Sequence, residues 1–450
     1  MDVSGPALAD LPPGPRWPAV VQLGTWLARP FELLLHLRET HGTPLTLRFP
    51  KWPAIVLFDD PEAIKEIFRG AAQDFHAGAA NEPLRPIVGG SSLLLIDGER
   101  HLRERKLLLP PFHGERMTRY AQVMRDVAVD DLASWPLDTP FAVQPRTQAI
   151  TLDIILRTVF GTEEGAKQDT LRAALNDLIR DFSQPGQMVN FLQRDLGPRS
   201  PWGRYLRTRD RTDALIYAEI DARRAQPRMG GEDIFTMLLE ARHEDGAPMS
   251  REELRDELVT MLVAGHETTA TALSWAFHHL IEHPSVQQKV HEELDRVMGD
   301  GPIDPERGGE LVYLDAVIKE TLRVIPVIAA VGRVLQRPAT IAGIDLPAGV
   351  MVSPSIWLTH MNPSVYERPD RFEPERFVDV KPSPYAWFPF GGGVRRCIGM
   401  AFALFEMRIV LATVLQKHRV CRAPGASHRP VRRSVTMAPA GGTPIILRRR

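Results

Sequence analysis

The sequence has very little cysteine, since Cys397 and Cys421 are the only two in 450 residues. This excludes a small secreted scaffold held by disulfides, and we expect no bridge between the two. No Cys-x-x-Cys pair indicates zinc or thioredoxin-like redox chemistry. Long apolar runs are also missing, because none approaches the ~18 residues of a membrane-spanning helix. The N-terminus has no basic stretch followed by an apolar one, so we expect no signal peptide and a cytoplasmic protein.

An excess of charge of either sign is missing too. The 55 Lys and Arg residues balance 56 Asp and Glu residues, and the net charge of −1 gives no general attraction to nucleic acid. With 44% hydrophobic and 25% charged residues, the composition excludes a disordered, collagen-like or coiled-coil chain. Length alone allows about two to four domains. Because no repeat, low-complexity segment or clear linker divides the chain, we predict one domain over residues 1–450, with a Pro-rich lead-in at 1–20.

Apolar residues recur mostly at the helical period, so we predict a mainly α fold with small β-sheets. Asp60-Pro61 marks the start of a helix after two β-like runs. Glycine-containing turns predict loops at 230–231 and 299–309. The predicted β segments are 45–49, 54–58, 340–355 and 435–447, and the predicted helical segments are 99–109, 117–134, 149–160, 169–182, 204–224, 233–242, 250–283, 314–325 and 400–417.

The longest predicted helix has clear signals at both ends. Ser250-Arg-Glu-Glu253 is a capping box, and His283-Pro284 ends the apolar pattern. At 1.5 Å per residue the helix is about 45–50 Å long, enough to cross a domain. It is apolar nearly all round, which places it in the core. Its middle, residues 264–269, is poor helix-forming material and indicates a local opening for a ligand.

The sequence Phe390-Gly-Gly-Gly-Val-Arg-Arg-Cys397 leads directly into the last long helix. A cysteine beside arginines and just before a helix N-terminus has its thiolate favoured. The glycines leave room for a flat group, Phe390 could shield the sulfur, and Arg395 could pair with a carboxylate. One thiolate cannot close a tetrahedral zinc site, but it can be the axial ligand of a haem iron. A buried inert cysteine and a cysteine nucleophile are the alternatives.

Phe390-x-x-Gly393-x-Arg395-x-Cys397-x-Gly399 resembles the haem-binding signature of the cytochrome P-450 family. The resemblance implies the family's fold, a long central helix over a buried haem, and haem b with Cys397 as the axial ligand of its iron. Three further segments resemble motifs of the same family, in the expected order: Ala264-Gly265-x-Glu267-Thr268-Thr269, Glu320-Thr-Leu-Arg323 and Pro374-Glu-Arg376-Phe377.

By this resemblance Glu267 and Thr268 are the catalytic residues, with Thr268 hydrogen-bonding the oxygen to be activated and Glu267 relaying protons from solvent. The segment starting at His266 begins like a metalloprotease helix, but position 270 is Ala, so that zinc site is missing. As structure alone, Glu267 and Thr268 could be a polar pair bonded to the helix backbone.

Glu320 and Arg323 lie three residues apart on one face of a predicted apolar helix. Alone, they would be an ordinary surface pair, but the apolar surroundings favour burial. A buried ion pair is weak evidence for stability. The resemblance makes them, with Arg376, a structural triad that holds the cysteine loop and takes no part in catalysis.

The basic run that starts at Glu99 has two interpretations, an ordinary solvated helix face or a functional element. In the second, His101 and Arg105 point inward and, with Arg333, bind the haem carboxylates. Many family members have Trp in place of His101, but His also donates to a carboxylate. The outward residues of the run would form a basic patch for an acidic electron-transfer protein; they are Arg100, Arg103 and Lys106, joined by Arg396.

The resemblance predicts a bacterial-type soluble haem-thiolate monooxygenase that inserts one oxygen atom of O2 into a lipophilic molecule. No dinucleotide-binding motif occurs, so electrons come from a separate ferredoxin or flavodoxin with its reductase. Apolar candidates for the pocket favour a fatty acid, terpenoid, steroid or polyketide-like substrate, under a mobile lid at 75–94. The candidate pocket residues are Val263, Ala264, Val327, Ile328, Ala330 and Met437.

Three other functions fit the same motifs less well. A peroxygenase of the same fold would not need the Glu267-Thr268 relay. A haem-thiolate isomerase or dehydratase would need no electron supply. A non-catalytic haem protein that senses a gas would need an effector domain, and the sequence offers none.

Overall fold

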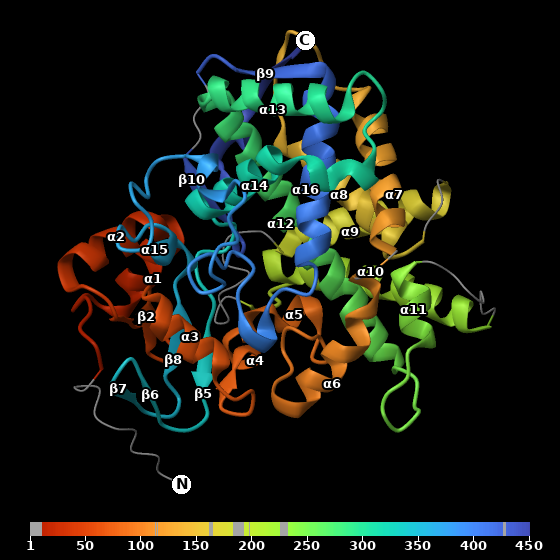
Figure 1. Cartoon of the computed structure of the whole chain (residues 1–450). Coiled ribbons are helices and arrows are strands. Elements are labelled where there is room, and N and C mark those ends of the chain that lie inside the picture. Colours follow the sequence, from red (N-terminus) through yellow and green to blue (C-terminus); the bar gives the residue numbers. More distant parts are fainter. Residues whose placement is uncertain are drawn as a thin grey trace.

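The computed structural model describes residues 11–112, 114, 116–161, 165–182, 193–197, 199–225, 233–425 and 429–450. Helices make up most of it, and the largest sheet lies to one side beside α1 and α2 (Figure 1). The predicted mainly α fold with small sheets is confirmed. The α-helices are α1 (Ala19–Ala28), α2 (Pro30–His41), α3 (Pro61–Arg69), α4 (Ala77–Ala80), α5 (Arg85–Val88), α6 (Gly98–Leu108), α7 (Arg116–Leu132), α8 (Gln144–Thr158), α9 (Ala166–Phe182), α10 (Pro201–Ala225), α11 (Ile234–Glu240), α12 (Arg251–Glu282), α13 (Pro284–Met298), α14 (Val312–Val324), α15 (Ile356–His360) and α16 (Met400–Lys417).

Twelve strands among the described residues form four small sheets. The five-stranded sheet has the order β1-β2-β8-β5-β3. Strands β2 and β8 pair in parallel, and the other three pairs of neighbouring strands in this sheet are antiparallel. A three-stranded sheet has the order β4-β12-β9, and β6-β7 and β10-β11 are hairpins. The strands are β1 (Leu45–Leu47), β2 (Ile55–Phe58), β3 (Phe75–His76), β4 (Pro140–Ala142), β5 (Arg333–Leu335), β6 (Ala339–Ile341), β7 (Ile344–Leu346), β8 (Met351–Pro354), β9 (His418–Arg422), β10 (Pro430–Arg433), β11 (Thr436–Pro439) and β12 (Pro444–Arg449).

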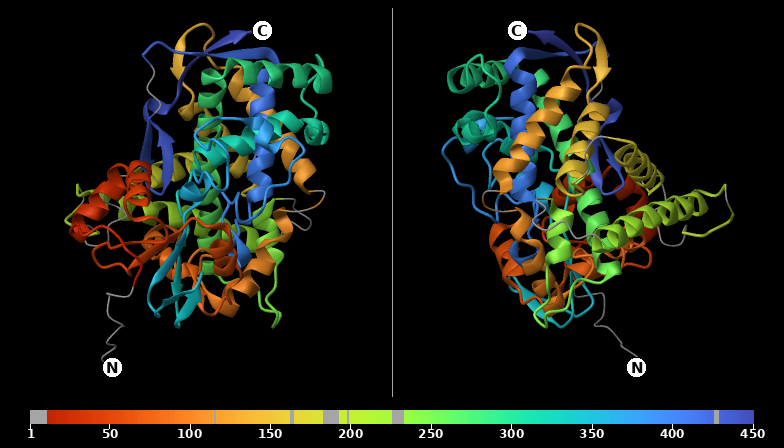
Figure 2. Two further views of the ribbon diagram at one scale, coloured as in Figure 1. Left: turned by 60° about the vertical axis from the view of Figure 1, so that its left-hand side comes forward. Right: turned by 90° about the vertical axis from the view of Figure 1, so that its right-hand side faces the viewer.

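The long helix α12 runs through the middle of the molecule, surrounded by other helices in both views of Figure 2. Its predicted capping box is confirmed: the Glu253 amide donates to Ser250 Oγ over 3.1 Å, and the Ser250 amide donates to the Glu253 carboxylate over 2.8 Å. The helix continues through residues 264–269 without a break. A helix of 32 residues that crosses the core can present its middle turns to an interior site.

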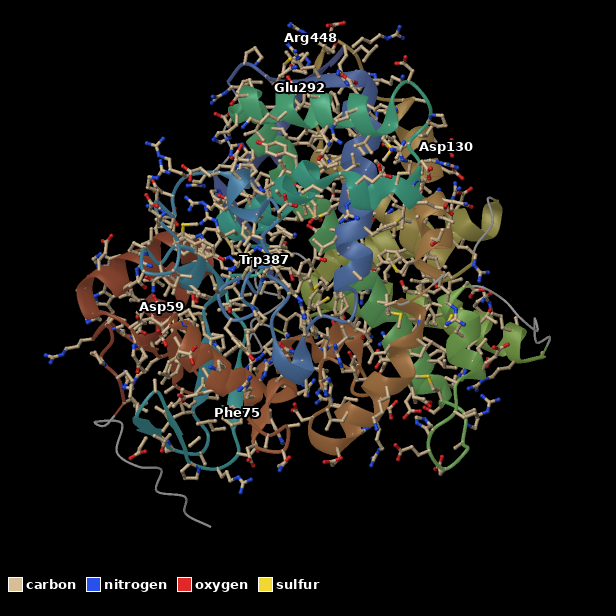
Figure 3. All side chains as sticks on the ribbon, viewed as in Figure 1. Asp59, Phe75, Asp130, Glu292, Trp387 and Arg448 are labelled. Carbon is tan, nitrogen blue, oxygen red and sulfur yellow. The ribbon has the colours of Figure 1, made fainter. Side chains whose placement is uncertain are left out.

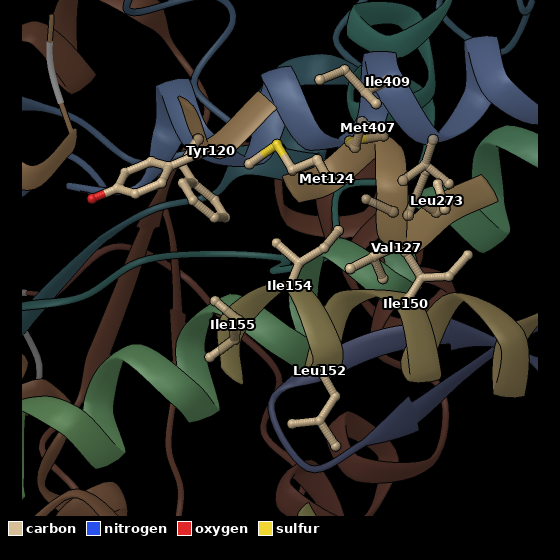
Figure 4. Close-up of a cluster of buried hydrophobic side chains, with 14 of the residues drawn as sticks. Tyr120, Met124, Val127, Ile150, Leu152, Ile154, Ile155, Leu273, Met407 and Ile409 are labelled. Atoms are coloured by element: carbon tan, nitrogen blue, oxygen red, sulfur yellow. The ribbon is translucent and has the colours of Figure 1, made fainter. Parts of the chain in front are cut away.

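Helix α12 packs closely on α8, and Gly265 allows this approach. A Cβ at position 265 would lie 2.9 Å from Ile155 Cδ1 of α8. The glycine is therefore explained by helix packing and not by an opening for a ligand. Figure 4 shows the same apolar layer, in which Leu273 of α12 meets side chains of α7, α8 and α16. These buried side chains fix the position of α12 and of the helix that follows Cys397.

Several segments differ from the sequence prediction. Residues 305–310, which overlap the end of the predicted loop 299–309, form a 3-10 helix, because Asp304 caps it and Pro305 fits its first turn. Helix α1 starts at Ala19, within the predicted lead-in, and α1, α2 and α13 were not predicted. The predicted loop at 230–231 and the first ten residues of the lead-in lie outside the described residues. Among the helices described, none is long and apolar enough to cross a membrane.

Candidate functional site

The loop that carries Cys397 is shaped by glycines. The Cys397 amide donates to the Phe390 carbonyl over 2.9 Å, and this hydrogen bond closes the loop just before α16. Gly393 has φ +63°, and a Cβ there would lie 2.2 Å from the Phe68 carbonyl oxygen. At Gly392 a Cβ would meet the Phe68 ring. Close packing on Phe68 therefore explains these two glycines, and their leaving room for a flat ligand stays a prediction.

The Cys397 side chain is exposed, yet the protein surrounds it closely enough for burial to raise the pKa of its thiol. The backbone hydrogen bond from Gly399 and the charges of Arg105 and Arg396 act in the opposite direction. Burial outweighs them, so the predicted stabilisation of a free thiolate is wrong. Cys421 lies in β9, and both cysteines are free.

His101 and Arg333 are buried with too few hydrogen-bond partners. His101 is 2% exposed, and its Nδ1 has no partner in the described part of the chain. Burial, then the charges of Arg395, Arg105 and Arg333, lower its pKa to about 3. Arg333 is 6% exposed and, among the residues that the structure describes, donates only to backbone carbonyls. Burial and the Arg395 charge lower its pKa to about 10.

Arg395 contacts a carboxylate of the protein itself. It hydrogen-bonds Asp97 and the Ile96 carbonyl, and it donates to the Leu93 carbonyl over 3.0 Å. Asp97 also accepts from the amide of Gly78 over 2.9 Å and thereby joins β3–α4 to the cysteine loop. The sequence prediction missed Asp97, since an Asp before a helix normally indicates only a cap.

These groups fit a haem, the cofactor that the cysteine motif implies. Besides burial, the charges of three arginines lower the pKa of His101, Arg395 lowers that of Arg333, and Arg105 lowers that of Arg395, as like charges do when they are crowded together. Asp97 is the carboxylate in contact with this cluster. Two more carboxylates, such as those of a haem, would provide the missing opposite charge and accept from the unpartnered His101.

Helix α12 presents Ala264 and Thr268 on one side and Glu267 on another. Ala264 is exposed and its neighbours at 263, 265, 267 and 268 are half-buried, whereas the turns before and after them are buried, so this turn borders an open space. Thr268 Oγ1 donates to the Ala264 carbonyl. The Glu267 carboxylate instead accepts from Gln148 Nε2 of α8 over 2.9 Å, and burial raises its pKa. Gln148 was missed because nothing in the sequence of α8 marks it.

The six predicted pocket residues lie on different parts of the core. Met437 is 1% exposed, and its amide donates to the Val327 carbonyl over 2.9 Å, so β11 and the 325–332 segment lie side by side. Val263 packs with Val327 in the largest apolar cluster, Ala330 with Met437 in a second and Ile328 in a third. That all six line one pocket stays a prediction.

The predicted lid at 75–94 is folded, with β3, α4, α5 and a 3-10 turn at Glu82–Leu84. Its end is tied to α12: the Ser91 amide donates to Asp256 over 2.8 Å, and the Leu93 amide donates to Glu257 over 2.7 Å. Its mobility stays a prediction, and a movement of its end would have to break these two bonds.

Glu320 and Arg323 of α14 form a fully buried ion pair, with Nε to Oε2 at 2.7 Å. Arg376 lies 3.6 Å from the same carboxylate, so the structure brings the predicted triad together. Arg323 also donates to the His360 carbonyl, and the Phe388 amide donates to His360 Nε2 over 3.3 Å. The pair is thus linked to the segment that enters the cysteine loop.

Replacing Arg323 with Leu is expected to lower the free energy of unfolding by about 3–5 kcal/mol, because the buried Glu320 carboxylate loses its partner. Urea titration followed by circular dichroism measures this. Arg307→Leu is the matched control, since Arg307 and Glu310 are also three residues apart and 2.7 Å distant but exposed. An equal loss in both variants would contradict a structural role for the buried pair.

The four residues of the predicted basic patch are all exposed (Arg100, Arg103, Lys106 and Arg396). Arg100 lies 3.5 Å from the Glu253 carboxylate, which partly neutralises it. Arg396 borders a surface hollow of about 270 Å³ that the cysteine loop forms with Phe68 and Trp387. Trp387 is 6% exposed and lies near the middle of the view in Figure 3, whereas Asp130 and Arg448 lie toward its edge.

The sequence model described as Cytochrome P450 matches residues 11–443, and the chain therefore belongs to the cytochrome P-450 family. It is a cytochrome P-450 monooxygenase with a haem cofactor. The protein named cytochrome P450 135B1 of Mycobacterium tuberculosis is 41% identical over 447 residues, which cover 99% of this chain and 93% of the relative. Cytochrome P450 138 of the same organism is 35% identical over 450 residues, with 99% and 98% covered.

Two solved structures have the same fold. Retinoic acid-bound cyanobacterial CYP120A1 is 26% identical with a TM-score of 0.86, and the match covers 98% of this chain and all of that one. The cytochrome P450DA heme domain is 23% identical with a TM-score of 0.85, and 98% of each chain is covered. The predicted family and fold are confirmed.

Proposed function

We propose that this monooxygenase binds haem b with the Cys397 sulfur as axial ligand and oxidises a lipophilic small molecule. The observation that carries the proposal is the enclosed thiol beside a buried cluster of cationic groups. His101, Arg105 and Arg333 would hold the haem carboxylates, while Arg395 keeps its bond to Asp97. Phe390 and Gly393 would shape the loop, and Gly399 would donate to the sulfur.

When bound, the haem supplies the activation of O2 and its insertion into a C–H or C=C bond. The chain's own task is to position groups and to move protons. Gln148 orients the Glu267 carboxyl through its Nε2 donor. Because burial raises the pKa of Glu267, this group can hold a proton closer to neutral pH than an exposed Glu can. Thr268 offers its hydroxyl next to Ala264, on the open side of α12.

The substrate class and the redox partners complete the proposal. The solved CYP120A1 binds retinoic acid, a carboxylic acid that is otherwise apolar, which supports a fatty acid, terpenoid, steroid or polyketide-like substrate here. A ferredoxin or flavodoxin with its reductase would supply electrons to a cytoplasmic enzyme formed by residues 1–450 as one domain. The exposed Arg103, Lys106 and Arg396 favour an acidic partner.

A screen of the purified ferric protein against lipophilic compounds tests this function. Compounds that bind near the iron are expected to shift its spectrum from low to high spin, and NADPH with a ferredoxin and its reductase should then oxidise them. Label from 18O2 should enter the product. Turnover with hydrogen peroxide but never with the redox proteins would instead establish a peroxygenase.

Replacing Arg333 with Gln is expected to weaken haem binding by about tenfold, because the variant loses a charge-assisted hydrogen bond to a haem carboxylate. Titration of the apoprotein with hemin measures this. Arg337→Gln is the control, because Arg337 lies close by in sequence but is exposed and paired with Asp74 at 2.6 Å. Unchanged hemin affinity in the Arg333 variant would remove Arg333 from the haem site.

A further inference from the structure

Helix α1 turns apolar side chains toward solvent and a polar side chain toward the core. Gln22 is 2% exposed, while Val20 is 65% and Val21 is 47% exposed. At 3.6 residues per turn, the exposed positions of α1 all fall within about a third of the helix circumference. A surface helix normally shows the opposite arrangement. The exposed positions in this stripe are Val20, Val21, Gly24, Leu27 and Ala28, none of which has a polar side chain.

The inward amide of Gln22 fixes this orientation. Its Nε2 donates to the carbonyls of Trp17 over 2.8 Å and of Pro15 over 3.2 Å, and its Oε1 accepts from the Arg48 amide over 2.9 Å. A rotation that buried the apolar stripe would break all three bonds. The outward apolar face is therefore built into the packing of α1.

Two further exposed tryptophans lie near α1. Trp17 is 38% and Trp52 is 37% exposed, and ring contacts from Trp26 to Phe49 (6.0 Å) and from Phe49 to Trp52 (6.4 Å) join α1 to the turn after β1. Five of the ten large hydrophobic side chains exposed in the described structure lie between residues 17 and 52. We call this surface the N-terminal patch; it consists of Trp17, Val20, Val21, Gly24, Leu27, Ala28 and Trp52.

The segments that form the N-terminal patch carry charges of one sign, and the exposed Glu32 of α2 follows directly after the first of them. Residues 11–31 and 42–54 contain no Asp or Glu. They contain Arg16, Arg29, Arg48 and Lys51, of which all but the half-buried Arg48 are exposed. An apolar centre, tryptophans and a basic rim together match the interface of a bilayer with anionic lipid. Two copies of this patch would bring like charges together, which disfavours self-association.

We propose that the N-terminal patch docks on the surface of a bilayer that contains anionic phospholipid, with α1 lying in the plane of the interface. A helix of 10 residues is far too short to span the bilayer. Helix α1 lies at the edge of the molecule, so this face can approach a flat surface (Figures 1 and 2).

Docking there would place the bilayer next to a part of the core that contains predicted pocket residues. Leu23 and Trp26, on the inner side of α1, pack against the same apolar cluster as Ala330 and Met437. A lipophilic substrate could then reach the enzyme from the membrane. This use of the surface rests on the proposed function, whereas lipid binding itself does not.

Co-sedimentation of the full-length, haem-loaded protein with vesicles tests the proposal. Binding to phosphatidylglycerol vesicles is expected to exceed binding to phosphatidylcholine vesicles and to fall with salt. The double variant Val20→Asp, Val21→Asp should lower the partition coefficient by at least about tenfold, since each substitution removes an apolar side chain that the bilayer would bury. Val312→Asp, at an exposed valine elsewhere, is the matched control and should bind like wild type.

Charge reversal at Arg29 and Lys51 should remove the preference for phosphatidylglycerol. The proposal is overturned if wild type stays in the supernatant with phosphatidylglycerol, or if the double Asp variant binds as wild type does. It is also overturned if wild type is a dimer that the double Asp variant converts to a monomer without any lipid binding. Normal monooxygenase activity together with no lipid binding would reject the patch alone and leave the proposed function intact.

Discussion

A Cys397→Ser variant loaded with haem is expected to lose the far-red-shifted Soret band that the ferrous carbon monoxide adduct shows when a thiolate is the axial ligand. The protein surrounds the sulfur at 397 beside Arg105 and Arg396, and burial raises the pKa of its thiol. Cys397 would hold the haem iron through its deprotonated sulfur, because a metal binds the thiolate and not the thiol. A serine oxygen cannot replace that bond, so the expected loss is complete.

Cys421→Ser is the matched control for this experiment. Cys421 is the only other cysteine, and it lies in β9, where it is paired with Ile446 of β12. Its replacement should leave the Soret band unchanged. The ligand assignment is wrong if Cys421→Ser abolishes the band, or if Cys397→Ser retains it.

Most long helices were predictable because their buried residues repeat at the helical period. The capping box of Ser250 and Glu253 predicted the start of α12, and both of its hydrogen bonds are present in the structure. Helix α13 was missed because Pro284 was interpreted only as a stop, although proline also suits the first turn of the next helix. Helix α1 was missed because its outward face is apolar and hides the usual amphipathic pattern.

The candidate site was predictable where a residue type has few alternative uses, as for Cys397 in its glycine loop. Partners that depend on tertiary structure could not be predicted. Asp97 and Arg395 are separated by almost 300 residues in the chain, and their contact forms only when α6 packs beside the cysteine loop. The thiol pKa was misjudged for the same reason, because burial is a property of the folded chain and here outweighs the nearby arginines.

The buried triad of α14 connects fold and site. Arg323 binds the His360 carbonyl, and His360 accepts from the Phe388 amide two residues before Phe390. Trp387 adds a bond from its Nε1 to the Lys319 carbonyl over 3.1 Å. Loss of Arg323 should therefore disturb the cysteine loop as well as global stability, although no member of the triad touches Cys397.

Replacing Thr268 with Ala is expected to separate electron consumption from product formation. The variant should still consume NADPH with the redox proteins, but most of the electrons should appear as hydrogen peroxide. A positioned proton donor contributes roughly 100-fold or more to such steps, so product per NADPH should fall by at least about tenfold. The hydroxyl, held by the Ala264 carbonyl on the open side of α12, is the group removed. Product, peroxide and NADPH are measured in the same reaction.

Two matched variants separate the effect of the Thr268 hydroxyl on coupling from the effect of the substitution on the helix. Thr268→Ser keeps a hydroxyl and should restore most of the coupling. Thr260 makes the same kind of bond on the same helix, to the Asp256 carbonyl over 2.6 Å, but it lies two turns away against Ser92. Thr260→Ala should therefore leave coupling unchanged while costing some stability. Full coupling in Thr268→Ala would show that proton delivery does not need the Thr268 hydroxyl. Equal uncoupling in Thr260→Ala would also exclude a specific role of Thr268, because the effect would then come from a disturbed helix.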